Sequence, residues 1–251
     1  MLKNRIIPIQ LLSDGRLVKG RKFGDYRDVG DPVKSSHVYS MQDADELILL
    51  NIDGHDRLSD LIALLPKLSE QVFMPISIGG GIRSYSDAAM LIKEGADKVV
   101  LNSVTYNNYS MITDIANDYG CQSVAVCIDV REIDGTYLLF SENGHTKHSV
   151  SLDQHIETCI EAGAGEIILQ SIDLDGSMRG FDLCLALFAN KYTTTPFILA
   201  GGSGDYSHIK DVFLSSKTSA VACGSLFNFS DSSPIRAKHY LKNYGVNYKR
   251  V

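Results

Sequence analysis

Met74-Pro-Ile-Ser-Ile-Gly-Gly-Gly81 and Thr195-Pro-Phe-Ile-Leu-Ala-Gly-Gly202 are two versions of one motif, a short apolar run that ends in glycines. Their prolines lie 121 residues apart, close to half of the 251-residue length. Two more pairs keep nearly this spacing: Asn102-Ser-Val104 with Gly224-Ser-Leu226, and Leu50-Asn-Ile-Asp53 with Gln170-Ser-Ile-Asp173. Repetition at a fixed period indicates repeated structural units. We therefore expect two related halves, about 1–120 and 121–251.

Short apolar runs alternate with amphipathic stretches along the whole chain. Eight runs predict strands: Arg5–Leu11, Glu46–Asn51, Pro75–Ile78, Lys98–Leu101, Ser123–Asp129, Glu166–Ser171, Pro196–Ala200 and Ala220–Cys223. They are mostly unbroken, which is typical of parallel strands buried on both faces. Helices are predicted at Asp56–Val72, Ser84–Glu94, Leu152–Ala162 and Asp205–Ser215. Eight β/α units in about 250 residues predict one domain, 1–251, folded as a (β/α)₈ TIM barrel of two half-barrels with pseudo-twofold symmetry. An open doubly wound sheet is the alternative.

One segment interrupts the alternation. Val130–Val150 holds two turn signals, Asp134-Gly135 and Asn143-Gly144, on either side of a β-rich run. This pattern predicts an antiparallel hairpin inserted after the fifth strand. His145-x-x-His148 lies in its polar turn, so we interpret it as part of that turn rather than as a metal-binding pair. Gly20–Val29 is predicted to be a loop, and whether it closes over a ligand stays open.

Composition excludes several classes of function. Thirty acidic residues against 24 basic ones give a net charge of −6, which disfavours a nucleic-acid or anionic-membrane partner. The apolar runs are too short for a membrane span, and the N-terminal residues lack a signal-peptide core. The odd number of five cysteines, with no CxxC pair, predicts buried free thiols rather than disulfides or a zinc site. We expect a cytoplasmic protein without metal or other cofactor.

Glycine clusters follow two of the predicted strands, and a small polar residue follows the next strand in each half, on the face where functional loops of such barrels lie. Gly80 and Gly81 end the third strand, and Asn102 and Ser103 follow the fourth. In the second half the equivalent residues are Gly201, Gly202, Gly224 and Ser225. Glycine lets backbone N–H groups approach an oxyanion closely. We therefore predict two phosphate sites, suited to a ligand with a phosphate at each end; tight turns alone are the alternative.

Asp129 closes the fifth apolar strand. A carboxylate in that place is costly unless it has a partner or a function, so we predict proton transfer or ligand orientation. By the repeat, its counterpart on the first strand is Gln10 or Leu11. Leucine can neither accept nor give a proton, so the pair of carboxylates expected for general acid–base catalysis is missing.

Motifs along essentially the whole chain resemble those of the HisF family, the cyclase (synthase) subunit of imidazole glycerol phosphate synthase. The matching stretches are Asp14-Gly-Arg-Leu-Val-Lys-Gly20, Gly30-Asp-Pro32, Gly79-Gly-Gly-Ile82, Gly95-Ala-Asp-Lys98, Gly163-Ala-Gly-Glu166, Ser171-Ile-Asp-Leu-Asp-Gly176 and Tyr240-Leu-Lys-Asn-Tyr-Gly-Val246. The resemblance implies a TIM barrel with a glutaminase (HisH-type) subunit docked where the strands begin. Ammonia then crosses the barrel to a bisphosphorylated ribonucleotide on the other face, where cyclisation and lyase cleavage follow.

The resemblance also assigns roles at the docking face. Arg5, Glu46, Lys98 and Glu166 stand at the positions of the family's ammonia gate, a ring of alternating charges. Asp97 resembles the family's contact to the glutaminase. Four inward charges need mutual pairing, so a ring that only stabilises the bottom of the barrel is the alternative interpretation.

On the opposite face the chain departs from the family. The family's strand-one aspartate is Leu11, the aspartate ending strand two is Asn51, and small hydroxyl residues on strands six and seven are Gln170 and Ala200. The resemblance keeps Lys19 and Asp129 as catalytic residues and Gly176 as a phosphate ligand. It implies substrate-orienting roles for Asp175, Asn51 and Gln170.

These departures resemble a HisF-like branch found in surface-polysaccharide gene clusters. That branch implies nitrogen delivery for converting a sugar acetamido group to an acetamidino group, with a sugar amidotransferase as third subunit. Two alternatives stay open. One is a cyclase of histidine biosynthesis that relies on Asp129 and Lys19. The other is a non-catalytic, phosphate-binding activator of the glutaminase.

Overall fold

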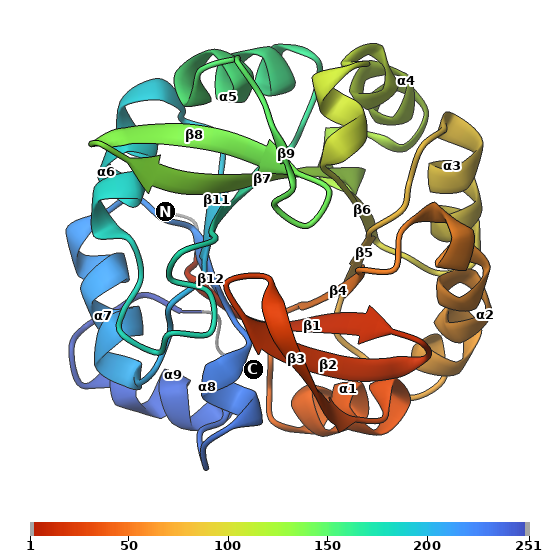
Figure 1. Ribbon diagram of the computed structural model, residues 1–251. Helices are drawn as coiled ribbons and strands as arrows, with labels where there is room; N and C mark the ends of the chain where they lie inside the picture. Colours follow the sequence, from red (N-terminus) through yellow and green to blue (C-terminus); the bar gives the residue numbers. More distant parts are fainter. Residues whose placement is uncertain (1–2, 249–251) are drawn as a thin grey trace.

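Eight parallel strands close into a barrel in the computed structural model, which describes residues 3–248 (Figure 1). The barrel strands are β1 (Arg5–Ser13), β4 (Leu47–Asn51), β5 (Ile76–Gly79), β6 (Lys98–Leu101), β7 (Val124–Ile133), β10 (Glu166–Ser171), β11 (Phe197–Ala200) and β12 (Ala220–Cys223). The pairing of β7 with β10 closes the circle. The predicted TIM barrel is confirmed, and the open sheet is wrong. The outermost residues of the expected 1–251 domain lie outside the described range.

Helices surround the strands (Figure 1). They are α1 (Pro32–Met41), α2 (Leu58–Ser69), α3 (Tyr85–Lys93), α4 (Ser110–Tyr119), α5 (Leu152–Glu161), α6 (Leu183–Tyr192), α7 (Tyr206–Ser215), α8 (Ser225–Asn228) and α9 (Pro234–Lys242). Three 3₁₀ turns add η1 (His55–Arg57), η2 (Ser103–Tyr106) and η3 (Cys121–Ser123). Ser84 begins α3 with a reciprocal cap to Asp87, as its sequence predicts. The predicted helix Asp56–Val72 is shorter in the structure because its first turn is the 3₁₀ turn η1.

The barrel lumen, the space enclosed by the eight strands, is filled with apolar side chains. Ten buried residues form it: Ile7, Ile48, Val100, Ala125, Cys127, Ile168, Ile198, Ala200, Ala220 and Ala222. A larger apolar layer lies between the strands and the helices, for example at Leu61, Leu65 and Leu68 of α2. Such a lumen is a packed core, so polar groups are confined to the two ends of the barrel.

Two antiparallel hairpins lie on opposite sides of the barrel mouth (Figure 1). The expected one after β7 is confirmed as β8 (Thr136–Ser141) and β9 (Thr146–Lys147). The second, β2 (Arg16–Arg21) with β3 (Gly24–Gly30), includes Gly20–Val29, so the prediction of a loop there is wrong: its residues pair as antiparallel strands. The hairpins extend strands that begin 119 residues apart, a spacing compatible with the proposed half-barrels.

Five cysteines are free, but Cys121 and Cys184 are exposed, so the expectation that all are buried is wrong for these two. Both lie near helix ends on the outer layer, where burial is incomplete. Within residues 3–248, His, Cys, Asp and Glu side chains form no cluster of three or more able to hold a metal ion. Over the same range, none of the helices combines the length and apolar character that a membrane span needs.

Candidate active site

A cavity of about 610 Å³ lies at the carboxyl end of the barrel, between the two hairpins. It brings together nine residues predicted from the sequence: Lys19, Asn51, Gly80, Gly81, Asn102, Ser103, Asp129, Gln170 and Asp175. The other predicted phosphate ligands do not line it: Gly176, Gly201, Gly202, Gly224 and Ser225. The cavity therefore joins one of the two glycine clusters to the expected acid–base residue.

Asp129 is the central ionisable group of this cavity. It lies on β7 opposite Gln170 of β10 and is 6% exposed. Its carboxylate accepts a hydrogen bond from Asn102 Nδ2 at 2.8 Å and a weaker one from Cys127 Sγ at 3.6 Å. Burial raises the pKa of Asp129 to about 7, and these two donors partly oppose the rise. Asp129 can thus both accept and give a proton at neutral pH.

Asp129 does not end its strand as the sequence suggests. β7 continues to Ile133 because the chain beyond Asp129 pairs with β8, while the barrel pairing with β10 ends at Val130 and Ser171. Asp129 therefore lies where β7 passes from pairing with β10 in the barrel to pairing with β8 in the hairpin.

Leu11 occupies the position across the barrel from which a second carboxylate is missing. It lines the cavity together with Ile9, Leu50 and Val100, so this part of the floor is apolar. Gln10 lies outside the cavity lining and accepts a hydrogen bond from Ser36 Oγ at 2.9 Å. The structure thus identifies Leu11, not Gln10, as the counterpart of Asp129.

Lys19 and Asp175 form a buried ion pair at the cavity wall. Lys19 Nζ lies 2.5 Å from Asp175 Oδ1, and both side chains are almost fully buried. The backbone N–H of Lys22 also donates to the Asp175 carbonyl at 3.0 Å. These two contacts fasten the β2–β3 hairpin to the loop after β10. Asp175 Oδ2 is buried and has no partner within residues 3–248, which leaves one acceptor for a ligand.

The two amide side chains predicted to orient a substrate are engaged with backbone. Asn51 Nδ2 donates to Gly54 O at 2.8 Å, and its Oδ1 accepts from Asp53 N at 3.0 Å. Gln170 Nε2 donates to Ser171 O at 3.2 Å. Asn51 therefore shapes the loop after β4, while its orienting role and that of Gln170 stay predictions.

The glycine cluster that lines the cavity has a left-handed backbone, and its phosphate-binding role stays a prediction. Gly80 and Gly81 adopt φ of 90° and 81°. A Cβ atom at Gly81 would lie 2.6 Å from the Gly54 carbonyl oxygen, so glycine is also needed for the packing of two loops. Arg83 and His55 line the cavity nearby. Neither was predicted from the sequence, although Arg83 follows the glycines by two residues.

The second glycine cluster lies outside the cavity lining, and we call it the covered cluster for that reason. A Cβ atom at Gly202 would lie 1.9 Å from Gly180 O, and one at Gly176 would lie 2.3 Å from Gly20 O. The β2–β3 hairpin and the loop after β10 therefore pack directly on these glycines. Ser225 Oγ is buried without a partner among residues 3–248, so a donor for an anion remains behind this cover.

We expect Ser103→Ala to weaken the binding of inorganic phosphate by roughly ten- to a hundredfold, since it removes a hydroxyl from the cluster that lines the cavity. Losing one hydrogen bond to a charged group costs roughly 1.5–3 kcal/mol. Ser225→Ala, its counterpart in the covered cluster, should leave the affinity nearly unchanged. Isothermal titration calorimetry with inorganic phosphate measures both, and the reverse order of effects would contradict this assignment. A bulky residue at Gly81 should also weaken phosphate binding, but the contact with Gly54 would disturb the fold as well.

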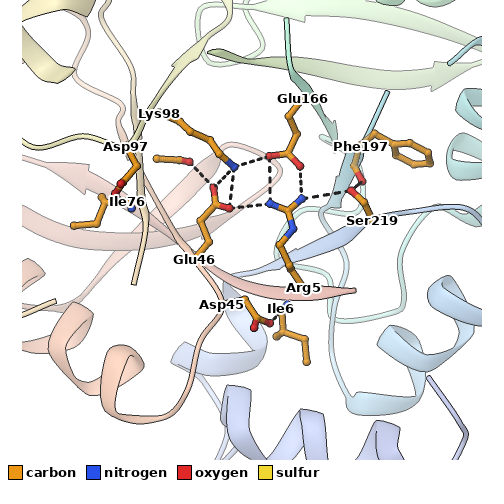
Figure 2. Close-up of polar contacts among 11 residues, drawn as sticks. Arg5, Ile6, Asp45, Glu46, Ile76, Asp97, Lys98, Glu166, Phe197 and Ser219 are labelled. Atoms are coloured by element: carbon orange, nitrogen blue, oxygen red, sulfur yellow. Dashed lines mark hydrogen bonds and ion pairs between the residues drawn. The ribbon is translucent and has the colours of Figure 1, made fainter. Parts of the chain in front are cut away.

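Four alternating charges close the other end of the lumen (Figure 2). Arg5 Nη1 lies 2.9 Å from Glu46 Oε2, and Lys98 Nζ lies 3.0 Å from Glu46 and 2.9 Å from Glu166. Arg5 also pairs with Glu166, which completes the ring. Ser77 Oγ, inside the lumen, donates to Glu46 at 2.5 Å. Each charge thus has two opposite neighbours, as partly buried charges require.

The surroundings of this charge ring are open to a partner. A hollow of about 290 Å³ borders Arg5, Lys98 and Glu166. Asp97, the predicted partner contact, is exposed, and its Oδ2 accepts a hydrogen bond from Ile76 N at 2.8 Å (Figure 2). Asp97 therefore also fixes the start of β5, and its contact to a partner stays a prediction.

The hairpins supply cavity residues that sequence analysis missed. Phe23 and Tyr26 come from β2–β3, and Ser141 and His148 come from β8–β9. Burial raises the pKa of Tyr26 to about 12, so it stays protonated at neutral pH. The aromatic residues within Gly20–Val29 were the available signal, because aromatic side chains in a loop near a phosphate site often contact ligand.

Comparisons with known proteins agree with this geometry. The histidine biosynthesis protein family matches residues 5–232. The imidazole glycerol phosphate synthase subunit HisF of Thermotoga sp. (strain RQ2) is 38% identical over 250 residues, which cover 99% of this chain and 98% of the relative. The HisF subunits of Alkaliphilus metalliredigens (37% identical, 100% of both chains) and Streptococcus mutans (35%, 99% of this chain and 100% of the relative) are similar over their full lengths. The chain therefore belongs to the histidine biosynthesis protein family, as a member of its HisF group.

Proposed function

We propose that this chain is the synthase subunit of a glutamine amidotransferase. A glutaminase docks on the face that carries the charge ring, and ammonia passes through the lumen to the cavity at the other end. There it meets a phosphorylated small molecule held by Gly80, Gly81 and Ser103. The support is the arrangement of charge ring, apolar lumen and cavity with Asp129 along one barrel.

The lumen suits a small neutral molecule. Five of its ten residues are alanine or cysteine: Ala125, Cys127, Ala200, Ala220 and Ala222. Small side chains reduce the displacement that a passing molecule requires. An unpaired ammonium ion would lose its hydration in this apolar space, so the lumen favours ammonia in its uncharged form.

For the chemistry in the cavity we favour nitrogen delivery without cyclisation. Leu11 is the observation that carries this choice, because the floor opposite Asp129 offers no second carboxylate. Loss of one acid–base group typically costs ~10²–10⁴-fold in rate. Delivery of ammonia to an activated amide needs less proton transfer. The substrate we propose is a sugar acetamido group, which a sugar amidotransferase subunit presents to the cavity and which is converted to an acetamidino group.

A second candidate is the cyclase and lyase reaction of imidazole glycerol phosphate synthase in histidine biosynthesis. Similarity of 35–38% over the full length of subunits that carry that name favours it. Asp129, with a pKa of about 7, would then act as both acid and base, with Lys19 beside it.

Turnover of the bisphosphorylated ribonucleotide of the histidine pathway, with ammonium in place of the glutaminase, separates the two candidates. For nitrogen delivery we expect no turnover by the wild-type chain and measurable turnover by Leu11→Asp, a gain of at least ~10²-fold. Leu11→Asn is the matched control, since it is equally polar but cannot transfer a proton. Multiple turnovers by the wild-type chain would instead establish the cyclase.

A further inference from the structure

Three aromatic rings are stacked against one another at the wall of the cavity. The Tyr106 ring lies between two imidazoles, with its centroid 3.6 Å from that of His148 and 4.3 Å from that of His155. The interplanar angles are 1° and 7°. The rings come from η2, from the residue after β9 and from α5, so the stack joins three separate elements.

His148 is the ring of this stack that faces the cavity. Its Nε2 lies 2.8 Å from Ser141 Oγ, and its backbone N–H donates to Leu139 O at 2.9 Å. In the part of the chain that the structure describes, His148 Nδ1 has no hydrogen-bond partner. Burial lowers the pKa of His148, partly opposed by the charge of Glu142 on its own hairpin. The imidazole is therefore neutral near pH 7 and able to accept a proton.

The side of the stack away from the cavity is buried and uncharged. His155 is fully buried, and its Nδ1 lies 2.7 Å from Tyr109 Oη. Burial lowers the pKa of His155 to about 4, with a smaller contribution from His148. Tyr106 Oη is buried with no hydrogen-bond partner within residues 3–248, so Tyr106 contacts the two imidazoles through its ring and not through its hydroxyl. The stack thus fixes the plane of the His148 imidazole against a neutral support.

Most other ionisable side chains of the cavity either form an ion pair or hydrogen bond or keep the same charge across the neutral pH range. Lys19 pairs with Asp175, Asp53 with Ser13, Glu142 with Thr146 and His55 with the Gly81 carbonyl, and the guanidinium of Arg83 stays charged. The thiol of Cys127 has a raised pKa because of burial and the neighbouring Asp129. Asp129 and the two cavity histidines, His55 and His148, are the groups suited to proton transfer near neutral pH, and of these two imidazoles His148 is the one fixed by ring stacking.

We propose that His148 is the second proton-transfer group of this cavity, in the role that Leu11 cannot fill. With Nε2–H donating to Ser141 Oγ, the lone pair of Nδ1 is available to the ligand. Ammonia adds to the electrophilic carbon of the ligand, whose π bond opens with its electron pair moving to the attached heteroatom; Nδ1 then accepts a proton from the new ammonium nitrogen, and the N–H electron pair stays on that nitrogen. The Tyr106 ring face stabilises the resulting imidazolium. This inference rests on the proposed reaction with ammonia for its chemistry, and on the structure alone for the position of His148.

Histidine-selective NMR tests the position without any assay of turnover. The His148 signal, assigned by its loss in His148→Gln, should titrate below the ordinary range of a histidine, and His145, an exposed residue of the same hairpin, serves as the control signal. Saturating inorganic phosphate, bound at the cluster next to Ser103, should raise the His148 midpoint and leave His145 unchanged. Titration of His148 together with His145, with and without phosphate, would overturn the proposal.

Ammonium-dependent turnover of the bisphosphorylated ribonucleotide tests the role. If the wild-type chain turns over, His148→Gln should slow it by ~10²–10⁴-fold and His145→Gln should not. In the Leu11→Asp chain, which regains a carboxylate, the loss should be at least tenfold smaller. An equal loss in both backgrounds, or no loss in an active wild-type chain, would refute a proton-transfer role. Silence from every variant would count against the proposed function for this substrate, and the NMR titration then decides on His148 by itself.

Discussion

Asp129→Asn is expected to slow product formation in the complex with the glutaminase and, at the same pH, to make the fold more stable. The rate should fall by ~10²–10⁴-fold, because the amide cannot transfer a proton. The folded protein should become more stable because burying the charged carboxylate of Asp129 is unfavourable, and asparagine carries no charge. Burial raises the pKa of Asp129 from 3.8 to about 7. The oxygen of the introduced amide can still accept the hydrogen bond that Asn102 donates to Asp129.

The contribution of Asp129 to the stability of the folded state falls as pH rises. A carboxyl whose pKa is raised in the folded state gives its full stability below the unfolded pKa, and this is lost as pH rises through the folded pKa. The loss for Asp129 therefore develops between about pH 4 and pH 7 and is complete above pH 7. At 1.36 kcal/mol per pH unit it amounts to roughly 4 kcal/mol as an upper value.

Thermal unfolding of both proteins at pH 4, 6 and 8 measures this effect. The melting temperature of Asp129→Asn should exceed that of the wild type by a margin that grows with pH. Asp134→Asn, which changes an exposed residue in the turn of the same hairpin, is the control. Its melting temperature should stay close to that of the wild type at all three pH values. A constant difference between Asp129→Asn and wild type across this range would contradict the raised pKa.

Lys98→Ala is expected to uncouple glutamine use from product formation in the complex with the glutaminase. Lys98 contacts both carboxylates of the charge ring, at 3.0 Å and 2.9 Å. Its removal opens one side of the ring, so ammonia can escape to solvent before it reaches the cavity. Because Arg5 still pairs with Glu46 and Glu166, neither carboxylate is left without a cation, and the fold should persist. Glu166→Ala should act in the same direction.

The ratio of product formed to glutamine hydrolysed measures coupling directly. We expect it to fall several-fold in Lys98→Ala, while turnover with external ammonium stays close to the wild-type value. Lys3→Ala removes an exposed lysine beside the same hollow and controls for a general loss of positive charge at the docking face. Unchanged coupling in Lys98→Ala would argue against passage through the ring. Aggregation of the variant would instead support a purely stabilising ring.

The barrel was predictable from sequence because its signals are local and repeated. Each of the eight apolar runs became a strand of the barrel, and Asp134-Gly135 and Asn143-Gly144 correctly predicted their hairpin. The β2–β3 hairpin escaped prediction because its turn places Lys22 and Phe23, not glycine, at φ of 51° and 63°.

Much of the site depends on contacts between distant residues, which local patterns do not contain. Asn51 and Asp175 were placed correctly at the cavity, yet the engagement of Asn51 by its own loop shows only in the structure. The covering of Gly176 and Gly202 by backbone is equally invisible in a sequence of glycines. The stack on Tyr106 likewise brings together rings from three elements that no local pattern connects.

The ion pair between Lys19 and Asp175 has a consequence for the ancestry of the chain. Its two members lie 156 residues apart, so one belongs to each of the proposed halves. A fragment that ends near residue 120 would carry the lysine without its counter-charge, and the complementary fragment would carry an unmatched aspartate. If one duplicated gene gave rise to both halves, their sequences have since diverged so that one half supplies the lysine and the other the aspartate of this pair. Neither half can now be exchanged for a second copy of the other without leaving a buried charge alone.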